Sequence, residues 1–333
     1  MTALSSPRGN SSDRFVGKES MSAAKTSKKV AVIGLGAMGY GIAASLVRKG
    51  LPVVGADANP EAVARFAEAS GTATSSSREA ASGAEVVVLV LVNAAQCEAV
   101  LFGEADVLSA TAANALIVSC VTMNPTDARS LGSRVEARGR AYLDAPTSGG
   151  PARAAEGALT ILASGPEEAM TRAEPLFEAV AAKVYRLGPE HGTGSAFKMI
   201  NQLLAGVHIA VACEAMVFAN KLGLDLARVY EVITASAGNS WMFENRVPHI
   251  LDNDYAPKSA VQIFTKDLGI VSDMARAKSF PTPLAASALQ MFLMTAAAGM
   301  SRDDDASVAR LYAKIAELDL VADKREANTR ARP

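Results

Sequence analysis

The segment from Gly192 to Gln202, G-T-G-S-A-F-K-M-I-N-Q, contains side chains that can do proton chemistry. Lys198 lies one turn into a strongly apolar stretch, and Asn201 follows three residues later, so a helix places both on one face. Burial of a lysine among apolar residues penalises its charge and lowers its pKa. A neutral amine there could accept a proton from a hydroxyl group. The alternative is a lysine whose stem covers the helix end while its amine stays in water.

A glycine-rich segment, G-L-G-A-M-G at residues 34–39, directly follows a β-rich run and begins a helical pattern. Gly34 permits a tight turn, Gly36 lets the backbone approach a pyrophosphate, and Gly39 lets helix and strand pack closely. The free N–H groups of the helix N-terminus would bind phosphates. A chance glycine turn is the alternative, but the strand–turn–helix context favours a dinucleotide site. The predicted cofactor-binding residues here are Gly34, Leu35, Gly36, Ala37, Met38 and Gly39.

Asp57 lies at the end of the second β-rich run, 23 residues after Gly34. A carboxylate at this place accepts hydrogen bonds from the adenosine ribose hydroxyls and repels a 2′-phosphate. The next residues are Ala-Asn-Pro, and Arg65 comes a helical turn later, so no arginine follows Asp57 closely. We therefore predict NAD, rather than NADP, as the cofactor.

A second loop, D-A-P-T-S-G-G-P from Asp144 to Pro151, leaves the fifth β-rich run. Ser148, Gly149 and Gly150 could offer a small nest of backbone N–H groups that suits a carboxylate. In an open α/β sheet, ligands bind beyond the carboxyl ends of the strands, where this loop would lie. A plain glycine-rich turn is the alternative.

Other residue types give weaker signals. Histidines occur at three scattered positions: His191, His208 and His249. None has an obvious carboxylate to orient it, so we expect structural roles for all three. Cysteines also occur at three separated positions: Cys97, Cys120 and Cys213. Their spacing predicts neither a disulfide framework nor a metal site, and favours reduced, buried thiols in a cytoplasmic protein.

Short β-rich runs alternate with alanine-rich helical patterns from residue 29 to residue 191. These runs occupy residues 29–34, 52–57, 85–92, 115–119 and 141–146, and two more follow at 158–164 and 183–188. Continuous apolar strands separated by helices predict a parallel sheet covered on both faces. We therefore expect an NAD-binding α/β Rossmann domain.

An all-helical domain is predicted for residues 192–322, joined to the first domain through a long interdomain helix from Ser195 to Leu222. That helix is apolar on most faces, so we expect it to be buried on all sides. Helix breaks are predicted at Asn239 and at four prolines: Pro248, Pro257, Pro281 and Pro283. The excess of apolar helix surface predicts a homodimer or homotetramer.

The bulk composition excludes several classes of protein. There are 33 basic and 34 acidic residues, and this balance differs from the basic footprint of a nucleic-acid binder. The longest apolar stretch, Leu203 to Cys213, is too short to span a bilayer, so no membrane partner is expected. Residues 1–28 are polar and serine-rich, without the apolar core of a signal peptide, and are expected to form a disordered tail. Residues 323–333 are expected to form a charged tail.

These segments together resemble the β-hydroxyacid dehydrogenase family, which includes 3-hydroxyisobutyrate dehydrogenase and tartronate semialdehyde reductase. The resemblance covers about Lys28 to Leu320 and rests on four motifs in the family's order. They are G-L-G-A-M-G, D-A-P-T-S-G-G, G-x-G-x-x-x-K-x-x-N and F-T-K-D-L. Such a set is much more specific than any single motif.

The resemblance implies a role for each matching residue. Lys198 would be the catalytic acid/base, and Asn201 would orient a small hydroxy-acid substrate. Thr122 would lie beside both the nicotinamide and the substrate, and Lys266 would close over the cofactor from the helical domain. Ser148, Gly149 and Gly150 would hold the substrate carboxylate, and further cofactor contacts are implied at Val92 and Asn93.

The sequence departs from the general family pattern at several places. Gln202 stands where the family has a second Asn, and S-C-V-T before Met123 lacks the usual leading Asp. The loop from Asn93 and the S-A-G-N-S-W-M-F-E-N-R segment resemble the branch that oxidises carbon 2 of L-threonate to 2-dehydro-L-erythronate. Tartronate semialdehyde reductase, 3-hydroxyisobutyrate dehydrogenase and imine reductase activities are alternatives, and a non-catalytic NAD-binding module is a more remote one. The presence of Lys198 argues against the imine reductases.

Overall fold

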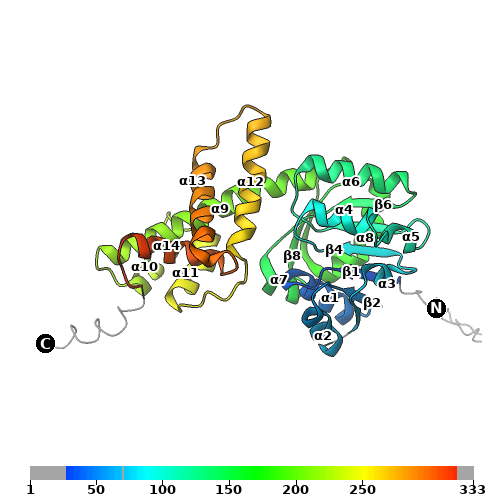
Figure 1. Cartoon of the computed structure of the whole chain (residues 1–333), viewed down its shortest axis with the longest axis horizontal. Coiled ribbons are helices and arrows are strands. Elements are labelled where there is room, and N and C mark those ends of the chain that lie inside the picture. Colours follow the sequence, from blue (N-terminus) through cyan, green and yellow to red (C-terminus); the bar gives the residue numbers. More distant parts are fainter. Residues whose placement is uncertain (1–27, 70, 321–333) are drawn as a thin grey trace, which may run out of the picture.

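The computed structural model describes residues 28–69 and 71–320. Two lobes lie side by side along the long axis, and helix α9 (Thr193–Lys221) runs from one into the other (Figure 1). The predicted tails at both ends lie outside the described residues, apart from Lys28. The predicted fold class, a Rossmann domain followed by an all-α domain, is confirmed.

The first lobe is built on a six-stranded sheet in the order β3-β2-β1-β4-β5-β6, in which every neighbouring pair is parallel. The strands are β1 (Val30–Ile33), β2 (Val53–Ala56), β3 (Thr72–Thr74), β4 (Val86–Leu89), β5 (Leu116–Ser119) and β6 (Ala141–Asp144). All four residues of β1, β4 and β5 are buried, as expected for strands covered on both faces. β3 was not predicted, because its three residues Thr-Ala-Thr carry no apolar run.

Helices cover both faces of this sheet. One apolar core packs it against α1 (Ala37–Arg48), α2 (Pro60–Ala69) and α8 (Glu167–Val180). The other core packs it against α3 (Ser77–Ala81), α4 (Ala94–Phe102), α5 (Val107–Ala110) and α6 (Pro125–Ala137). A smaller sheet of β7 (Thr147–Ser148), β8 (Leu159–Ala163) and β9 (Ala181–Arg186) adjoins β6, and α7 (Gly150–Glu156) lies between β7 and β8.

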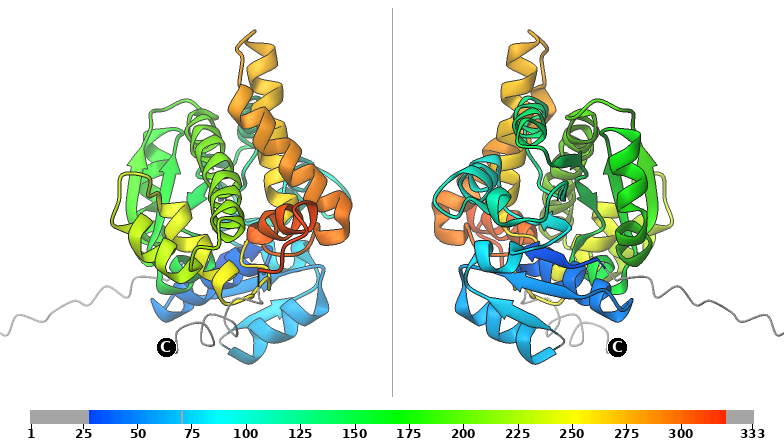
Figure 2. Two further views of the ribbon diagram at one scale, coloured as in Figure 1. Left: turned by 90° about the vertical axis from the view of Figure 1, so that its left-hand side faces the viewer. Right: turned by 90° about the vertical axis from the view of Figure 1, so that its right-hand side faces the viewer.

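The second lobe is entirely helical and surrounds α9. It comprises α10 (Leu226–Thr234), α11 (Trp241–Leu251), α12 (Val261–Ala277), α13 (Pro283–Thr295) and α14 (Val308–Ile315), with short η1 (Ala296–Met300) and η2 (Asp305–Ser307). α9 packs against α11, α12, α13 and α14 and is the centre of this core. The α12–α13 hairpin projects beyond the remaining helices (Figures 1 and 2).

One predicted break, at Pro248, is wrong, because this proline lies inside α11. Proline has no N–H to offer the carbonyl group four residues earlier, which belongs to Glu244. The Tyr230 hydroxyl donates to that Glu244 carbonyl oxygen at 3.1 Å instead. A tertiary contact thus replaces the helical hydrogen bond that the proline removes.

The expectation that α9 is buried on all sides is also wrong within a single chain. Large apolar side chains stand exposed along one of its faces: Phe197, Ile200, Leu204, Val211 and Phe218. By length and composition α9 and the Pro283–Met300 segment could each cross a bilayer, but half of the most apolar window of α9 is buried inside the protein. That burial is typical of a core helix.

Candidate active site

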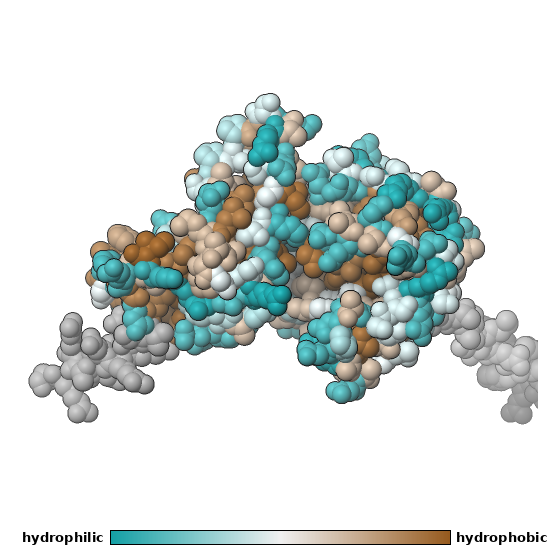
Figure 3. Space-filling model, viewed as in Figure 1, coloured by the Kyte–Doolittle hydropathy of each residue, from teal (hydrophilic) through white to brown (hydrophobic). Residues whose placement is uncertain are grey.

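A cavity of about 710 Å³ lies between the two lobes. Its Rossmann side comprises the glycine-rich turn after β1 and the loops that follow β4, β5 and β6. Its helical side comprises parts of α9, α11 and α12 and the loop before α12. The space-filling view shows a hollow between the lobes with apolar surface beside it (Figure 3). The cavity therefore lies beyond the carboxyl ends of the parallel strands, where α/β sheets bind ligands.

The glycine-rich turn depends on its glycines in three different ways. Gly34 has φ +99°, a conformation that residues with a side chain rarely adopt. A Cβ on Gly39 would lie 1.8 Å from the Gly34 carbonyl oxygen, so only glycine lets α1 pack this closely. A Cβ on Gly36 would meet nothing within 4 Å, and this residue faces the cavity. The backbone at Gly36 is thus open to a bound group.

Asp57 is fixed at the carboxyl end of β2. Its Oδ2 accepts from the Leu35 N–H at 2.7 Å and its Oδ1 from the Asn59 N–H at 2.8 Å. Each carboxylate oxygen keeps a second lone pair that can accept from a hydroxyl group. Arg65 shares a smaller hollow with Asp57, and its guanidinium donates to the Leu35 carbonyl oxygen at 3.0 Å. The arginine that seemed remote along the chain is therefore adjacent in space.

The other predicted cofactor residues divide into two groups. Those that line the cavity are Gly36, Ala37, Met38, Gly39, Val92, Thr122 and Lys266. Leu35 does not line it: its side chain is fully buried and its N–H is used by Asp57. Asn93 accepts from the Gln96 N–H at 2.9 Å and so caps α4. These last two residues support the site rather than face the cavity.

The predicted carboxylate loop borders the same cavity. Ser148 ends β7, and Gly149 and Gly150 follow it with φ of +129° and +76°. All three line the cavity opposite the helical lobe. The positive φ values explain why the sequence has glycine at both positions. The predicted loop and the predicted proton acceptor are thus brought to one site.

The first turn of α9 is bound to the Rossmann sheet by a buried carboxylate. Asp144, at the end of β6, accepts from the Ser195 N–H at 2.8 Å and from the Ser195 hydroxyl at 2.7 Å. The Gly194 N–H donates to the Ser164 hydroxyl oxygen at 2.9 Å. Burial raises the pKa of Asp144, and the hydrogen bonds from Ser195 oppose that shift. This joint sets the position of Lys198, one turn further along α9.

Lys198 is 7% exposed and lines the cavity. Burial lowers the pKa of its amine to about 8, against the opposing charge of Asp267 and with a smaller lowering from Lys266. We find no hydrogen bond from its Nζ to the described residues. An amine in this state can exchange a proton with a bound group near neutral pH. The snorkelling alternative does not fit this burial.

A chain of polar contacts surrounds Lys198. The Asn201 amide donates to Gln202 Oε1 at 3.0 Å, and the Gln202 amide donates to Asp267 Oδ2. Asp267, 1% exposed, also pairs with Lys266, whose Nζ donates to the Thr122 carbonyl oxygen at 3.2 Å. Gln202, the departure from the family's second Asn, is therefore a member of this network. It connects α9 and α12 to the Rossmann lobe.

Sequence reasoning missed the helical wall of the cavity, although it noted the segment around Trp241. This wall includes Trp241, Asn245, Arg246, His249 and Lys258. The expectation that no histidine has a carboxylate partner is wrong for two of the three. His249 Nδ1 lies 2.8 Å from Asp304, and His191 Nε2 lies 2.9 Å from Glu136. Both partners are 55 residues away along the chain, so no local pattern could identify them.

The three cysteines are free thiols, and Cys97 and Cys213 are buried. Cys120 lines the cavity, and burial raises its pKa to about 12, with a further rise from Asp144. A thiol with so high a pKa stays protonated at neutral pH and is a poor nucleophile.

Two family models cover most of the described chain. The NAD binding domain of 6-phosphogluconate dehydrogenase matches residues 29–188. The NAD-binding domain of NADP-dependent 3-hydroxyisobutyrate dehydrogenase matches residues 192–312. The L-threonate dehydrogenase of Cupriavidus necator is 52% identical over 286 residues, which are 86% of this chain and 96% of that protein. The chain belongs to the 3-hydroxyisobutyrate dehydrogenase family. It is an NAD-dependent oxidoreductase that acts on the hydroxyl group of a hydroxy acid.

Other members of the 3-hydroxyisobutyrate dehydrogenase family are also similar to this chain in sequence and in structure. The L-threonate dehydrogenase of Escherichia coli K12 is 45% identical and covers 86% of this chain and 95% of its own. A crystal structure of 3-hydroxyisobutyrate dehydrogenase from Salmonella typhimurium superposes with a TM-score of 0.81 at 46% identity, over 85% of this chain and 99% of that one. An imine reductase from Streptomyces aurantiacus, at 20% identity and a TM-score of 0.59, shares the fold alone.

The residues of this family member fit an NAD molecule. The turn at Gly36 is open where a pyrophosphate would approach, and the first N–H groups of α1 lie there. Asp57 has acceptor capacity left for ribose hydroxyls. The cavity that contains Lys198 continues from this turn. NAD would thus extend from Asp57 to the cleft.

Proposed function

We propose that this dehydrogenase oxidises the carbon-2 hydroxyl of L-threonate to give 2-dehydro-L-erythronate. The observation that carries the proposal is the buried Lys198 amine, which has a pKa of about 8 and faces the same cavity as the Ser148–Gly150 loop. The 52% identity to an L-threonate dehydrogenase along 96% of that protein supports this choice of acid.

In the proposed reaction, backbone N–H groups at Ser148, Gly149 and Gly150 bind the substrate carboxylate. Asn201, held by Gln202, orients the hydroxyl group towards Lys198. The neutral Lys198 amine accepts the hydroxyl proton as the carbon–oxygen bond becomes a carbonyl, and it later releases that proton to water. NAD, when bound, supplies the acceptor for the hydride that leaves carbon 2.

We also propose that NAD is preferred over NADP. The Asp57 carboxylate would repel a 2′-phosphate at the adenosine ribose. Arg65 lies in the same hollow, but its guanidinium is engaged with the Leu35 carbonyl oxygen and lies 4.7 Å from the Tyr40 ring centroid.

We expect a cytoplasmic enzyme, in keeping with its free thiols and a soluble substrate.

A substrate panel tests this function directly. Purified enzyme is assayed by NADH absorbance with L-threonate, D-glycerate, L-serine and 3-hydroxyisobutyrate, each with NAD and with NADP. We expect kcat/KM to be highest for L-threonate with NAD. A higher value for D-glycerate or 3-hydroxyisobutyrate would replace L-threonate with one of the alternative activities, and equal use of NADP would refute the role given to Asp57.

A further inference from the structure

The helical wall of the cleft contains an arginine that is buried yet faces the cavity. Arg246, on α11, is 9% exposed. Its Nε and Nη2 donate to the two carboxylate oxygens of Asp305 at 2.6 and 3.0 Å, and its Nη1 donates to Asn245 Oδ1. Three of its five N–H bonds are thus used within the described chain. The bidentate pair fixes the guanidinium and leaves donors for a bound molecule.

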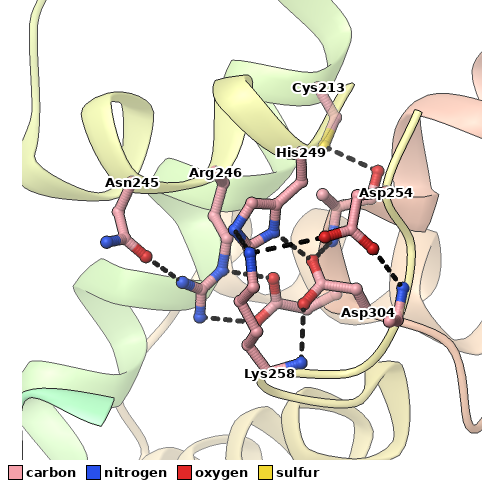
Figure 4. A network of polar contacts seen from close by, with 10 residues as sticks. Cys213, Asn245, Arg246, His249, Asp254, Lys258 and Asp304 are labelled. Carbon is pink, nitrogen blue, oxygen red and sulfur yellow. Dashed lines mark hydrogen bonds and ion pairs between the residues drawn. The ribbon is translucent and has the colours of Figure 1, made fainter. Parts of the chain in front are cut away.

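His249 lies three residues further on, on the same face of α11. Its Nδ1 lies 2.8 Å from Asp304 Oδ1 (Figure 4), and Asp304 is fully buried. Because the carboxylate accepts a hydrogen bond from Nδ1–H, the lone pair of the ring lies on Nε2, where it accepts from the Lys258 amine. Lys258 Nζ lies 3.2 Å from Nε2. Arg246, His249 and Lys258 all line the cavity, and the Arg246 guanidinium and the Lys258 amine keep N–H groups that a bound molecule can use.

Each cation of this wall has a carboxylate partner. Arg246 is paired with Asp305, Lys258 Nζ lies 3.6 Å from Asp254 Oδ2, and the Lys258 backbone N–H donates to Asp304. Although burial opposes its charge, the pairing with Asp305 raises the pKa of Arg246. Two cations therefore face three carboxylates, of which Asp304 and Asp305 are buried. A second anionic group on the ligand would gain little net attraction here, whereas a hydroxyl oxygen can accept from the N–H groups without adding a charge.

We propose that Arg246, together with the Lys258 amine that His249 holds in place, forms the subsite for the hydroxyl-bearing tail of the substrate. This inference rests on the proposed function, because the acid's carboxylate is assigned to the Ser148–Gly150 loop and its reacting hydroxyl to Lys198. The remaining hydroxyls then lie towards α11, where Arg246 donates to one and Lys258 Nζ, held by His249 Nε2, donates to another. The subsite selects polyhydroxy acids over short hydroxy acids and over dicarboxylates.

The test compares acids that differ only in the tail. L-Threonate is measured beside 2-hydroxybutyrate of the same carbon-2 configuration, which lacks both distal hydroxyls, and beside the tartrate in which the terminal CH₂OH is a carboxylate. We expect the wild type to prefer L-threonate to each by at least about 10-fold, the range of one or two hydrogen bonds to a charged group. Equal kcat/KM for L-threonate and 2-hydroxybutyrate, or a preference for the tartrate, would overturn the subsite.

The variant Arg246→Met should lower kcat/KM for L-threonate by about 10- to 100-fold and change that for 2-hydroxybutyrate by less than about 3-fold. His249→Gln, which disturbs the position of Lys258 Nζ, should change the two kcat/KM values in the same way. An equal fall for both acids would mean that Arg246 only supports the fold, which refutes the proposal. Arg310→Met is the matched control, because Arg310 pairs with Asp303 in the same lobe but does not line the cavity.

Arg246→Met alone leaves the buried Asp305 charge without its partner and could unfold the helical lobe. The double variant Arg246→Met/Asp305→Asn removes both charges. Its kcat/KM values for L-threonate and 2-hydroxybutyrate are compared in the same way. Dissociation constants of the two acids from the enzyme–NADH complex, measured by calorimetry, give a second readout that needs no turnover. Their ratio should fall towards one in both variants, and an unchanged ratio would overturn the subsite.

Failure of the proposed function is distinguishable from failure of the subsite. If the wild type oxidises another hydroxy acid and not L-threonate, the proposed function fails. The same variants are then compared on that acid and on its analogue without hydroxyls beyond the oxidised carbon. If L-threonate is the best substrate but Arg246→Met does not discriminate between the two acids, the function stands and the subsite is refuted.

Discussion

At the scale of the residue, the protonation state of the Lys198 amine results from opposing effects. Burial removes water from the amine and favours its neutral form. Asp267 favours the charged form, and Lys266 opposes it. The result is a pKa of about 8, low enough for a neutral fraction at physiological pH and high enough for a useful base.

Loss of this amine should abolish most of the turnover. We expect Lys198→Ala to lower kcat by more than about 100-fold, since general base catalysis contributes at least that factor. The dissociation constant of NADH should change little, because the glycine-rich turn and Asp57 are untouched. Lys221→Ala, at the exposed far end of the same helix, is the control and should keep full activity. Turnover of Lys198→Ala within a few fold of the wild type would refute the assigned mechanism.

The dependence of activity on pH follows from the same balance. Because the base must be neutral, kcat/KM should rise about 10-fold per pH unit below pH 8 and level off above it. Asp267→Asn removes the charge that stabilises the ammonium, so the midpoint should move to lower pH. Lys266→Met should move it to higher pH. Steady-state pH profiles measure both shifts, and shifts in one common direction would contradict this assignment.

At the scale of the element, the geometry of the site depends on how α9 joins the sheet. Ser195 and Asp144 connect the first turn of α9 to the end of β6, and a Cβ on Gly194 would lie 2.2 Å from the Leu162 carbonyl oxygen of β8. The position of Lys198 is therefore set by the sheet as well as by α9. Small residues at this joint let helix and strands approach closely enough for these hydrogen bonds.

Ser195→Ala removes the hydroxyl that donates to the buried Asp144 carboxylate. We expect the free energy of unfolding to fall by about 1–3 kcal/mol, the cost of an unsatisfied buried charged acceptor. We also expect kcat to fall with little change in NADH affinity, because Lys198 lies one turn away. Urea denaturation and steady-state kinetics measure both effects. Ser287→Ala, whose hydroxyl bonds only to its own helix, is the comparison, and an equal loss there would contradict the proposed joint.

At the scale of the whole molecule, two lobes enclose the cleft and a large apolar surface stays uncovered. Besides the exposed face of α9, the helical lobe exposes further large apolar side chains: Leu222, Leu224, Val232 and Leu293. Apolar surface is visible across this lobe in Figure 3. An uncovered apolar face on a long helix is typical of a protein interface.

We propose that this face joins copies of the chain into a homodimer or homotetramer. Light scattering at micromolar concentration should give a mass of two or four chains. Phe218→Glu, near the C-terminal end of the exposed face of α9, should shift the mass towards the monomer, because a charge would be buried at the interface. Lys49→Glu, on the exposed end of α1 in the other lobe, should leave the mass unchanged. A monomeric wild type would refute this proposal.

Local patterns in the sequence were sufficient to predict the strands, the helices and the motifs within them that are named below. The apolar runs predicted β1, β2, β4, β5 and β6, because a strand covered on both faces must be apolar along its length. The glycines at 34 and 39 predicted the turn and its close packing, since no other residue fits there. The segment around Lys198 left two alternatives open, a buried amine or an amine kept in water at the helix end, and the structure decided for the buried amine.

Only the tertiary structure decided which groups meet across the chain. It paired His249 with Asp304 and Arg246 with Asp305, and it brought Arg65 beside Asp57. It also kept α11 intact through Pro248, where Tyr230 supplies the missing donor. Periodicity and spacing in the sequence indicate the surroundings of a residue only with respect to its neighbours on the same helix or strand. The charges and donors that face it from other elements depend on how those elements pack, and this packing is fixed only when the whole chain folds.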